Sequence, residues 1–476
     1  MPQPRGWPTR NRRPWGLAAR GLGVAAVLLI AGSTAAAQTL TEALSYAYRN
    51  NPQLLAQRAA LRATDEEVPQ ALSGWRPTVN LNTQTGFNRV GQTANSALTG
   101  NPISQYGSFI NRSVQLQATQ PIYRGGRTEA ATRQAINTVQ AARAQTLSVE
   151  TSVFTLVVTA FLDVVRDQNL LEVSRHNEQV LRRQLEATRD RFRVGEVTRT
   201  DVAQAEAALA QAIAQRITTQ GTLDTSRSRY TQAVGHPPGR LIMPSERPAL
   251  PATRDEALAL AASNNFDVIS ATLTEASARD NVDFIRGQLL PQVSIVGTVG
   301  RTISPSLNQV GSRTDTASVV AQMTVPLYEA GSVYSQTRQA QQTVGQRRSQ
   351  VDVARREAVQ NATQSWETLQ AARASIASFV TAARAAQIAL EGTQQEALVG
   401  SRTVLDVLIA EQQLFTAQSN LVGAQHDAAL AEYTLVAAIG RLIAPTLKLP
   451  VELYDMEHHY KLVKDKWFGF GGGLKE

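Results

Sequence analysis

One local pattern occurs twice in the chain. The segment RFRVGEVTRTDV begins at residue 191, and EALVGSRTVLDV begins at residue 396. The residues that recur at a constant spacing of 205 positions are Gly195 and Gly400, Thr198 and Thr403, and Asp201 and Asp406. A glycine followed by a threonine and then an acid three residues later is typical of one helix ending and another beginning. The chain is therefore predicted to contain two copies of one structural unit.

The two copies extend well beyond this pattern. TLTEALSYAYRNNPQ from Thr39 matches TRDEALALAASNNFD from Thr253 at an offset of 214 residues, which later falls to 205. The change in length of nine residues falls between Gly86 and Pro121 in the first copy. It predicts a surface loop there, because length changes settle in loops. The predicted boundaries are 38–243 for the first repeat, 244–447 for the second and 448–476 for a C-terminal tail.

The first 37 residues have the layout of a secretory signal peptide. Five arginines precede an apolar run from about Leu22 to Ala31, and three alanines end the segment. Cleavage is predicted before Gln38, and the apolar run is too short to remain as a membrane span. Without this segment the net charge falls from +8 to +3, which removes the main argument for nucleic-acid binding. The protein is predicted to be exported.

Four segments alternate between apolar and polar residues, as β-strands do. They cover residues 77–88, 113–123, 291–300 and 318–328, with the least regular alternation in 291–300. In the first segment Val79, Leu81 and Phe87 fall on one face, while asparagine and glutamine fall on the other. The stretches 88–111 and 302–316, rich in Gly, Asn, Ser and Pro, are predicted to be loops that join each pair of strands.

Two long runs without proline are predicted to be helices of about 100 Å. They extend from about Gly126 to Arg193 and from Ser332 to about Leu390. Neither is apolar over eighteen residues, so no transmembrane helix is predicted. Each run is followed by a glycine-containing break, after which a further helix runs back to Gly235 or Gly440. The fold class is therefore α+β.

The number of strands constrains the assembly. Strands of this length suit an outer-membrane barrel, but barrels begin at about eight strands and one chain supplies four. An open sheet edge in lipid would leave backbone groups unpaired at a cost of several kcal/mol each. Three chains would close a barrel of twelve strands. This reasoning favours a trimer, although two chains with eight strands also satisfy the arithmetic.

The motifs together resemble the TolC family of outer-membrane exit ducts over nearly all of residues 38–447. The resemblance is carried by the tandem repeat, the NNP-type opening of each copy, the PIYRGG and PLYEAGS junctions, FRVGEVTRTDV and VGSRTVLDVL. It implies a homotrimer in the outer membrane of a Gram-negative cell, with a twelve-stranded transmembrane β-barrel continuous with a long periplasmic coiled-coil tunnel. It also implies a periplasmic adaptor and an inner-membrane transporter of the ABC or RND type. The tail at 448–476 would then be periplasmic, and the cargo would be protein, small molecules or both.

The repeated aspartate has two compatible interpretations. Thr198 with Asp201 and Thr403 with Asp406 match a capping box, which would occur wherever a helix restarts. The family resemblance adds that this turn lies at the periplasmic mouth of the tunnel. It implies a ring of carboxylates at Asp406 and a gate-locking network that includes Asp201, Thr200 and Arg402. Two positions depart from the family pattern, since Ile409 replaces a second acid and Ala397 replaces a tyrosine of the lock. Glu411, one turn further along, is a candidate to supply the missing acid.

Other interpretations remain open from the residues alone. Pro121, Gly126, Pro326 and Gly331 are predicted to form the strand-to-helix junctions. The five histidines show no metal-ligand spacing, and His458 and His459 are predicted to be a solvated pair. With no catalytic constellation and no phosphate-binding loop, neither an enzyme nor a cofactor nor a metal is predicted. A periplasmic coiled-coil adaptor, a structural surface protein and a secreted enzyme are the alternatives to an exit duct.

Overall fold

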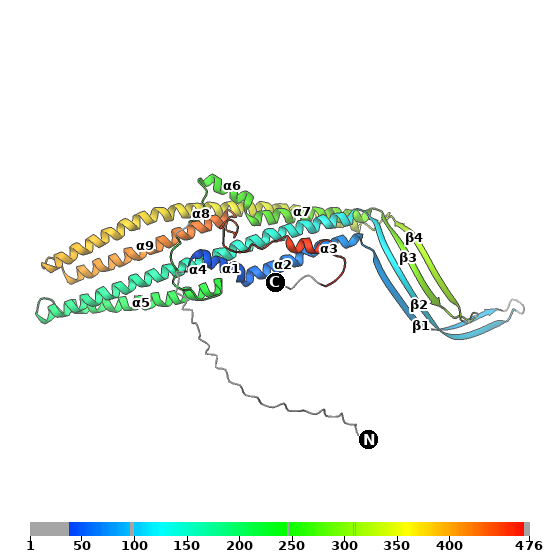
Figure 1. The fold of residues 1–476 in the computed structure, drawn as a ribbon, viewed down its shortest axis with the longest axis horizontal. Helices are drawn as coiled ribbons and strands as arrows, with labels where there is room; N and C mark the ends of the chain where they lie inside the picture. Colours follow the sequence, from blue (N-terminus) through cyan, green and yellow to red (C-terminus); the bar gives the residue numbers. More distant parts are fainter. Residues whose placement is uncertain (1–37, 96–99, 245–246, 308, 310, 471–476) are drawn as a thin grey trace, which may run out of the picture. The chain divides into compact units, whose positions relative to one another are not determined.

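The computed structural model describes residues 38–95, 100–244, 247–307, 309 and 311–470, and the predicted signal peptide at 1–37 lies outside them. Nearly the same order of elements occurs twice along the chain, with α2 and α3 of the first half in the place of α7 in the second (Figure 1). The first half contains α1 (Leu40–Asn50), α2 (Pro52–Asp65), α3 (Glu67–Leu72), η1 (Ser73–Trp75), β1 (Thr78–Asn95), β2 (Pro102–Arg124), α4 (Arg127–Arg193) and α5 (Arg199–Val234). The second half contains α6 (Arg254–Asn264), α7 (Phe266–Arg286), η2 (Gly287–Leu289), β3 (Gln292–Ile303), β4 (Arg313–Thr324), α8 (Ser332–Leu398) and α9 (Val404–Ala438). A short helix, α10 (His458–Val463), follows.

One asparagine near the start of each half, Asn51 in the first and Asn265 in the second, has the same structural role. Asn51 accepts a hydrogen bond from Gln53 N (2.9 Å) and caps α2, while its Nδ2 donates to the Ala233 carbonyl at the end of α5 (3.0 Å). Asn265 caps α7 in the same way and donates to the Ala438 carbonyl at the end of α9 (3.3 Å). Each asparagine therefore starts one helix and fixes the end of another.

The four strands form one antiparallel sheet in the order β1-β2-β3-β4, which leaves β1 and β4 as its edges. β1 pairs with β2 from Thr78↔Thr119 to Asn95↔Pro102. The pairing of β2 with β3 stops at Arg112↔Ile303, and β3 pairs with β4 over its whole length. The first hairpin therefore continues beyond the last rung that it shares with β3.

The predicted loop at 88–111 is wrong for most of its length. The structure has strand at 88–95 and 102–111. β1 and β2 have 18 and 23 residues, whereas β3 and β4 have 12 each. The difference in length between the copies is thus absorbed by a longer hairpin. Backbone pairing in register overrides the weak strand preference of Gly and Asn. The predicted loop at 302–316 likewise shrinks to the residues between Ile303 and Arg313.

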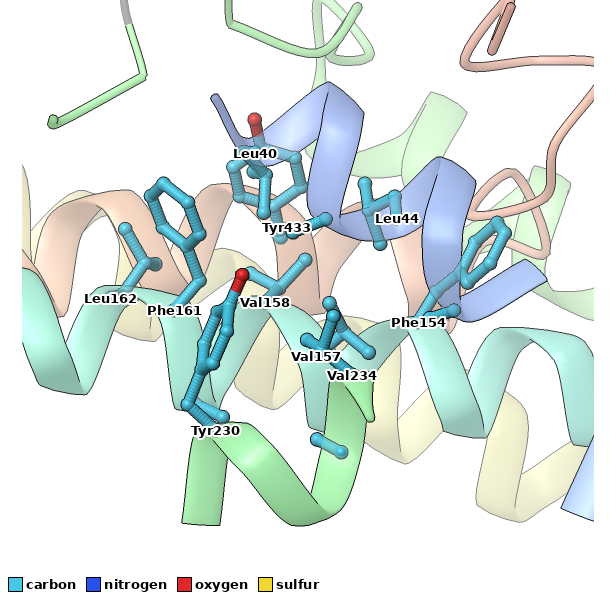
Figure 2. Close-up of a cluster of buried hydrophobic side chains, with 14 of the residues drawn as sticks. Leu40, Leu44, Phe154, Val157, Val158, Phe161, Leu162, Tyr230, Val234 and Tyr433 are labelled. Carbon is cyan, nitrogen blue, oxygen red and sulfur yellow. The ribbon is translucent and has the colours of Figure 1, made fainter. Parts of the chain in front are cut away.

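The helical core is built around α4. Phe154, Phe161 and Tyr230 are fully buried there, together with side chains from α1, α5, α9 and the segment after α9 (Figure 2). An 18-residue window of α4 is long and apolar enough to cross a membrane by composition, contrary to the sequence-based expectation, and 56% of it is buried. Its apolar side chains are accounted for by this core. A second, smaller core lies between α6, α8 and α9.

Candidate functional site

The two helix breaks form matching tight turns. α4 is followed by Gly195 at φ +83° and α8 by Gly400 at φ +81°. Glu196 N donates to the Arg191 carbonyl and Ser401 N to the Glu396 carbonyl, both at 3.0 Å. This bond closes the end of a helix around a left-handed residue, a conformation that glycine adopts without a steric penalty. The repeated glycine is thus required by the backbone.

Each turn leads into a complete capping box. Thr198 Oγ1 accepts from Asp201 N (3.3 Å), and Asp201 Oδ2 accepts from Thr198 N (2.8 Å). At the second turn Asp406 N donates to Thr403 Oγ1 (3.2 Å) and Thr403 N donates to Asp406 Oδ2 (2.9 Å). Thr200 is exposed on the first turn of α5. Both aspartates therefore satisfy the free N–H groups at a helix start.

The cation beside Asp406 is held within its own turn. Arg402 Nε donates to Glu396 Oε2 at 2.8 Å, and this contact raises the pKa of Arg402. The pKa of Asp406 is lowered, first by the backbone N–H of Thr403, then by its hydroxyl, and also by Arg402. No ion pair joins Asp201 to Arg402 within the described part of one chain. A lock between these residues would therefore require another arrangement of the turns or another copy of the chain.

The positions that depart from the family pattern differ in their surroundings. Ile409 is 47% exposed on α9, as is Leu405 at 44%, so an apolar surface adjoins Asp406. Ala397 packs against the buried contact of α8 with α9. Glu411 does not reach the turn, because it is buried and accepts a hydrogen bond from Gln394 Nε2 (3.1 Å). Burial raises the pKa of Glu411.

The start of α9 packs against the helix pair α4 and α5. Val404 and Leu408 pack against Leu181 and Leu185 of α4 and Ala205 of α5. A groove of about 530 Å³ lies beside this contact, lined by glutamines of α5 and α9 and by Leu405, Ile409 and Phe415. The second turn is therefore fixed to the first helix pair through apolar contacts just behind Asp406.

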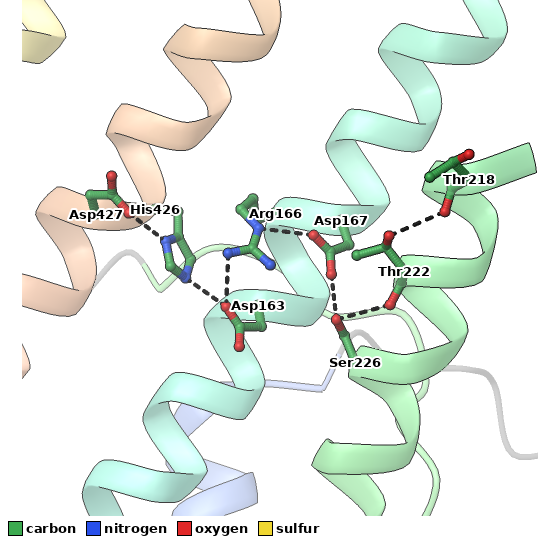
Figure 3. Close-up of polar contacts among 8 residues, drawn as sticks. All are labelled: Asp163, Arg166, Asp167, Thr218, Thr222, Ser226, His426 and Asp427. Atoms are coloured by element: carbon green, nitrogen blue, oxygen red, sulfur yellow. Dashed lines mark hydrogen bonds and ion pairs between the residues drawn. The ribbon is translucent and has the colours of Figure 1, made fainter. Parts of the chain in front are cut away.

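A buried polar cluster joins α4, α5 and α9, and sequence reasoning did not find it (Figure 3). Both ring nitrogens of His426 face carboxylates: Nε2 lies 3.0 Å from Asp163 Oδ1, off the direction of an ideal hydrogen bond, and Nδ1 lies 2.9 Å from Asp427 Oδ1. Arg166 bridges Asp163 (3.0 Å) and Asp167 (2.8 Å). Asp167 in turn accepts from Ser226 of α5. The only sequence signal was an isolated histidine in a helix, which is not distinctive.

The predicted junction residues lie between the sheet and the long helices. Gly126 and Gly331 are the N-caps of α4 and α8, at φ +73° and +76°. Pro121 lies inside β2, where the register shifts between Pro121 and Tyr123, and Pro326 follows β4. Among the described residues no cluster of His, Cys, Asp or Glu could hold a metal ion.

The chain belongs to the outer membrane efflux protein family, whose model matches residues 43–236 and 257–441. It is accordingly an outer-membrane protein of the TolC type. It is 36% identical to the outer membrane efflux protein BepC of Brucella suis over 95% of this chain and 97% of that protein. It is 28% identical to TolC of Vibrio cholerae over 88% of this chain and 94% of that protein. The alkaline protease secretion protein AprF of Pseudomonas aeruginosa is 27% identical over 57% of this chain and 58% of its own length.

The fold is also found among solved structures. The outer membrane protein VceC from Vibrio cholerae superposes with a TM-score of 0.72 at 21% identity. The match covers 84% of this chain and 96% of that one. The four strands and the long helix pairs therefore form a known channel fold. The periplasmic adaptor alternative does not fit a chain of this family.

Proposed function

We propose that three copies of this chain form an outer-membrane exit duct, with a twelve-stranded barrel continuous with a periplasmic helical tunnel. The observation that carries the proposal is a four-stranded sheet with one apolar face, one polar face and two open edges. In hydrocarbon each open edge must be paired, since unsatisfied backbone groups cost several kcal/mol apiece. Pairing β1 of one copy with β4 of the next satisfies both edges.

The register places the apolar residues on one continuous face. Leu81 pairs with Leu116, Leu116 with Val299 and Val293 with Met323. All of these side chains are at least partly exposed, and Leu81 and Met323 are 65% and 67% exposed. The other face carries mainly Asn, Gln, Ser and Thr, including Asn82 and Gln322. Such a sheet suits lipid on one side and water on the other.

The apolar face has a boundary at each end. Arg301 and Arg313 both bind Asp315 (2.6 Å each) at the end of the sheet near the β3–β4 turn. At the opposite end lie Trp75, just before β1, and Tyr123 of β2. From Val293 to Val299 the apolar band spans about 20 Å along the strand. Aromatic residues at the end next to the helices match the membrane-interface girdle of such barrels.

Two features support an internal duplication. The same family model matches 43–236 and 257–441, and each half has short helices, then two strands, then two long helices. We place the first repeat at 38–243, the second at 244–447 and the periplasmic tail at 448–476. Residues 1–37 act as the signal peptide, and N-terminal sequencing of protein from outer membranes should begin at Gln38.

The duct works with a periplasmic adaptor and an inner-membrane transporter of the ABC or RND type, and it has no chemistry of its own. Small-molecule efflux is supported by the family and by the similarity to BepC. Similarity to AprF supports export of protein through a type I system. The transporter selects the cargo. Small-molecule efflux and protein export are therefore distinguished by crosslinking the turns at Gly195 and Gly400 in cells and identifying the transporter that is captured.

The helix turns form the gate of this duct. Asp406 supplies three carboxylates around the axis, and Asp201, Thr200 and Arg402 hold the mouth shut between helix pairs. The supporting observation is that both aspartates are already oriented by their capping boxes at exposed turns. Arg402 can exchange Glu396 for Asp201 when turns of two pairs meet, because its pair with Glu396 is solvent-exposed.

The trimer is tested with matched substitutions on neighbouring residues. Leu81→Arg places a charge on the apolar face and should cost about 2–4 kcal/mol if it lies near the bilayer midplane. Asn82→Arg places the same charge on the polar face and should be tolerated. The measurement is migration of the unboiled trimer from outer-membrane fractions on a denaturing gel, with Met323→Arg and Gln322→Arg as a second pair. Normal assembly of Leu81→Arg and Met323→Arg would overturn the assigned faces.

A further inference from the structure

The C-terminal segment follows the helices toward the sheet. Tyr454 N donates to Tyr48 Oη in α1 (3.0 Å), and Arg58 of α2 lies over both rings. Further along, His459 Nδ1 lies 3.1 Å from Asp65 Oδ2, contrary to the expectation of a solvated histidine. These contacts lie in chain order along α1 and α2. The segment is therefore held against α1 and α2 and runs in the same direction as these helices.

The segment reaches the base of β1. Arg76 Nη1 donates to the Lys466 carbonyl at 2.7 Å, and its guanidinium carbon lies 5.0 Å from the centre of the Trp467 ring. Arg76 precedes the first residue of β1, Thr78, by two positions. Val79, the next residue, already belongs to the apolar face. Trp467 therefore lies at the end of the apolar band that adjoins the helices.

The residues at this place have the composition of a membrane-interface segment. Trp467, Phe468 and Phe470 are 57%, 85% and 111% exposed, although aromatic side chains are usually buried. Lys461, Lys464 and Lys466 precede them; Lys461 pairs with Glu457 (2.8 Å) and Lys464 with Asp465 (3.9 Å), both at solvent-exposed positions. Aromatic rings favour the boundary between headgroups and acyl chains, and lysines favour anionic headgroups. No other described contact explains why three aromatic side chains should project from this point.

We infer that residues 461–470 form a membrane anchor that inserts Trp467, Phe468 and Phe470 into the periplasmic leaflet of the outer membrane, with the lysines toward anionic phospholipid headgroups. The inference rests on the proposed transmembrane sheet, because the sheet defines where the membrane surface lies. Arg76 fixes the anchor to the first residues of β1. Three such anchors would surround the barrel at the level where it meets the helices. They would fix the distance between the helical part and the membrane surface.

The natural absence of cysteine allows a direct test with the full-length chain, because one introduced cysteine gives one labelling site. Phe468→Cys is labelled with an environment-sensitive fluorophore and reconstituted into vesicles of phosphatidylethanolamine and phosphatidylglycerol. The vesicles carry nitroxide-labelled lipid with the nitroxide near the headgroup or near the end of the chain. Ser378→Cys on the exposed face of α8, 46 residues beyond its start, is the aqueous control. Leu81→Cys on the apolar face of the sheet is the membrane control.

We expect a blue shift and a loss of fluorescence for the label at 468, with stronger quenching by the nitroxide near the headgroup. The label at 378 should show neither change, and the label at 81 should be quenched. Quenching at 81 but not at 468 would overturn the anchor and leave the barrel intact. If the label at 468 is protected from aqueous iodide but is not quenched by the nitroxide-labelled lipid, it is covered by protein. That result would also overturn the anchor. Absence of quenching at 81 would overturn the barrel and, with it, the anchor.

Discussion

At the scale of the residue, the repeated aspartate has a role in the isolated chain that needs no gate. Asp201 and Asp406 each complete a capping box, and this geometry follows from the T-x-x-D spacing alone. The spacing could therefore predict the local structure. It could not predict that Arg402 would pair with Glu396, because that contact depends on how the turn places two long side chains.

The first prediction at this scale concerns Asp406. Three carboxylates around one axis should favour cations in transit and bind multivalent cations, which relieve their mutual repulsion. Asp406→Ala should reduce both cation selectivity and block by a trivalent cation added from the periplasmic side. Ile409→Asp should tighten the block, because it adds a second ring on the exposed face of α9. Reversal potentials and block in planar bilayers measure both effects.

The same group predicts a pH dependence with a definite sign. Within one chain the N–H and hydroxyl of Thr403 lower the pKa of Asp406, which opposes the rise in pKa that two neighbouring carboxylates of the ring would cause. Selectivity and block should therefore persist at neutral pH and decline as the pH falls and the carboxylates are protonated. If Asp406→Ala leaves selectivity and block unchanged, the repeated aspartate is only a helix cap.

The second prediction at this scale concerns the lock. Asp201→Ala and Arg402→Ala should each raise single-channel conductance and admit bulky antibiotics into cells, because either change removes one charge of the pair. Asp201→Ala should leave the trivalent block in place, which separates the lock from the ring. Thr198→Ala is the matched control, since it removes the cap at a cost of about 1 kcal/mol but leaves the charge. Equal effects of Thr198→Ala and Asp201→Ala would assign the phenotype to capping.

At the scale of the element, the long helices and strands were predictable from periodicity and from the absence of proline. The extent of the first hairpin was not, because Gly, Asn and Ser between residues 88 and 111 disfavour strand locally while backbone pairing favours it. The contacts between helices could not be predicted from the sequence either. His426 and Asp163 are 263 residues apart, and only the packing of α9 on α4 brings them together.

That contact leads to a prediction about helix packing. Burial acts to lower the pKa of His426, but the contacts with Asp163 and Asp427 outweigh it, so the pKa is raised. Asp167, Arg166 and Arg229 are the other charged groups near the cluster. A raised pKa means that the charged histidine stabilises the fold below about pH 6.5 and that this contribution is lost as pH rises through the folded-state pKa.

We therefore expect resistance of the helical part to unfolding to fall between mildly acidic and mildly alkaline pH. His426→Gln should flatten this dependence, because glutamine can hydrogen bond but does not titrate. Urea unfolding of the purified protein, followed by circular dichroism, measures the effect. His176→Gln on the exposed surface of α4 is the matched control and should keep the wild-type profile. An unchanged profile in His426→Gln would contradict the assignment.

At the scale of the whole molecule, the two repeats share one core. Phe161 of the first repeat is fully buried in a cluster that includes Tyr433 and Leu442 of the second. Glu150 accepts a hydrogen bond from Ala444 N (2.7 Å), and burial raises the pKa of this carboxyl. The repeat in the sequence indicated two similar units, but not that they would be joined through a common interior, because symmetry in sequence does not specify the contact surface.

The shared core predicts that its loss weakens both repeats together. Phe161→Ala should lower the free energy of unfolding by about 3–5 kcal/mol, since it removes a fully buried ring. Leu156→Ala, at a position 47% exposed on the same helix, should have a much smaller effect. Denaturant unfolding followed by circular dichroism checks the difference. Loss of only one part of the helical signal in Phe161→Ala would show that the repeats unfold independently.

If the proposed trimer forms, the unequal hairpins would determine which part of the protein faces the outside of the cell. β1 and β2 continue for ten paired positions beyond Arg112, from Gly86↔Asn111 to Asn95↔Pro102, whereas β3 and β4 end near the last rung that they share with β2. At about 3.3 Å per residue, this extension is roughly 30 Å long. In the proposed trimer β1 and β2 of the first repeat would project farthest from the cell surface, as three separate ribbons. Antibodies and bacteriophages approaching from outside would first meet β1 and β2, and substitutions that evade such agents should accumulate in that hairpin.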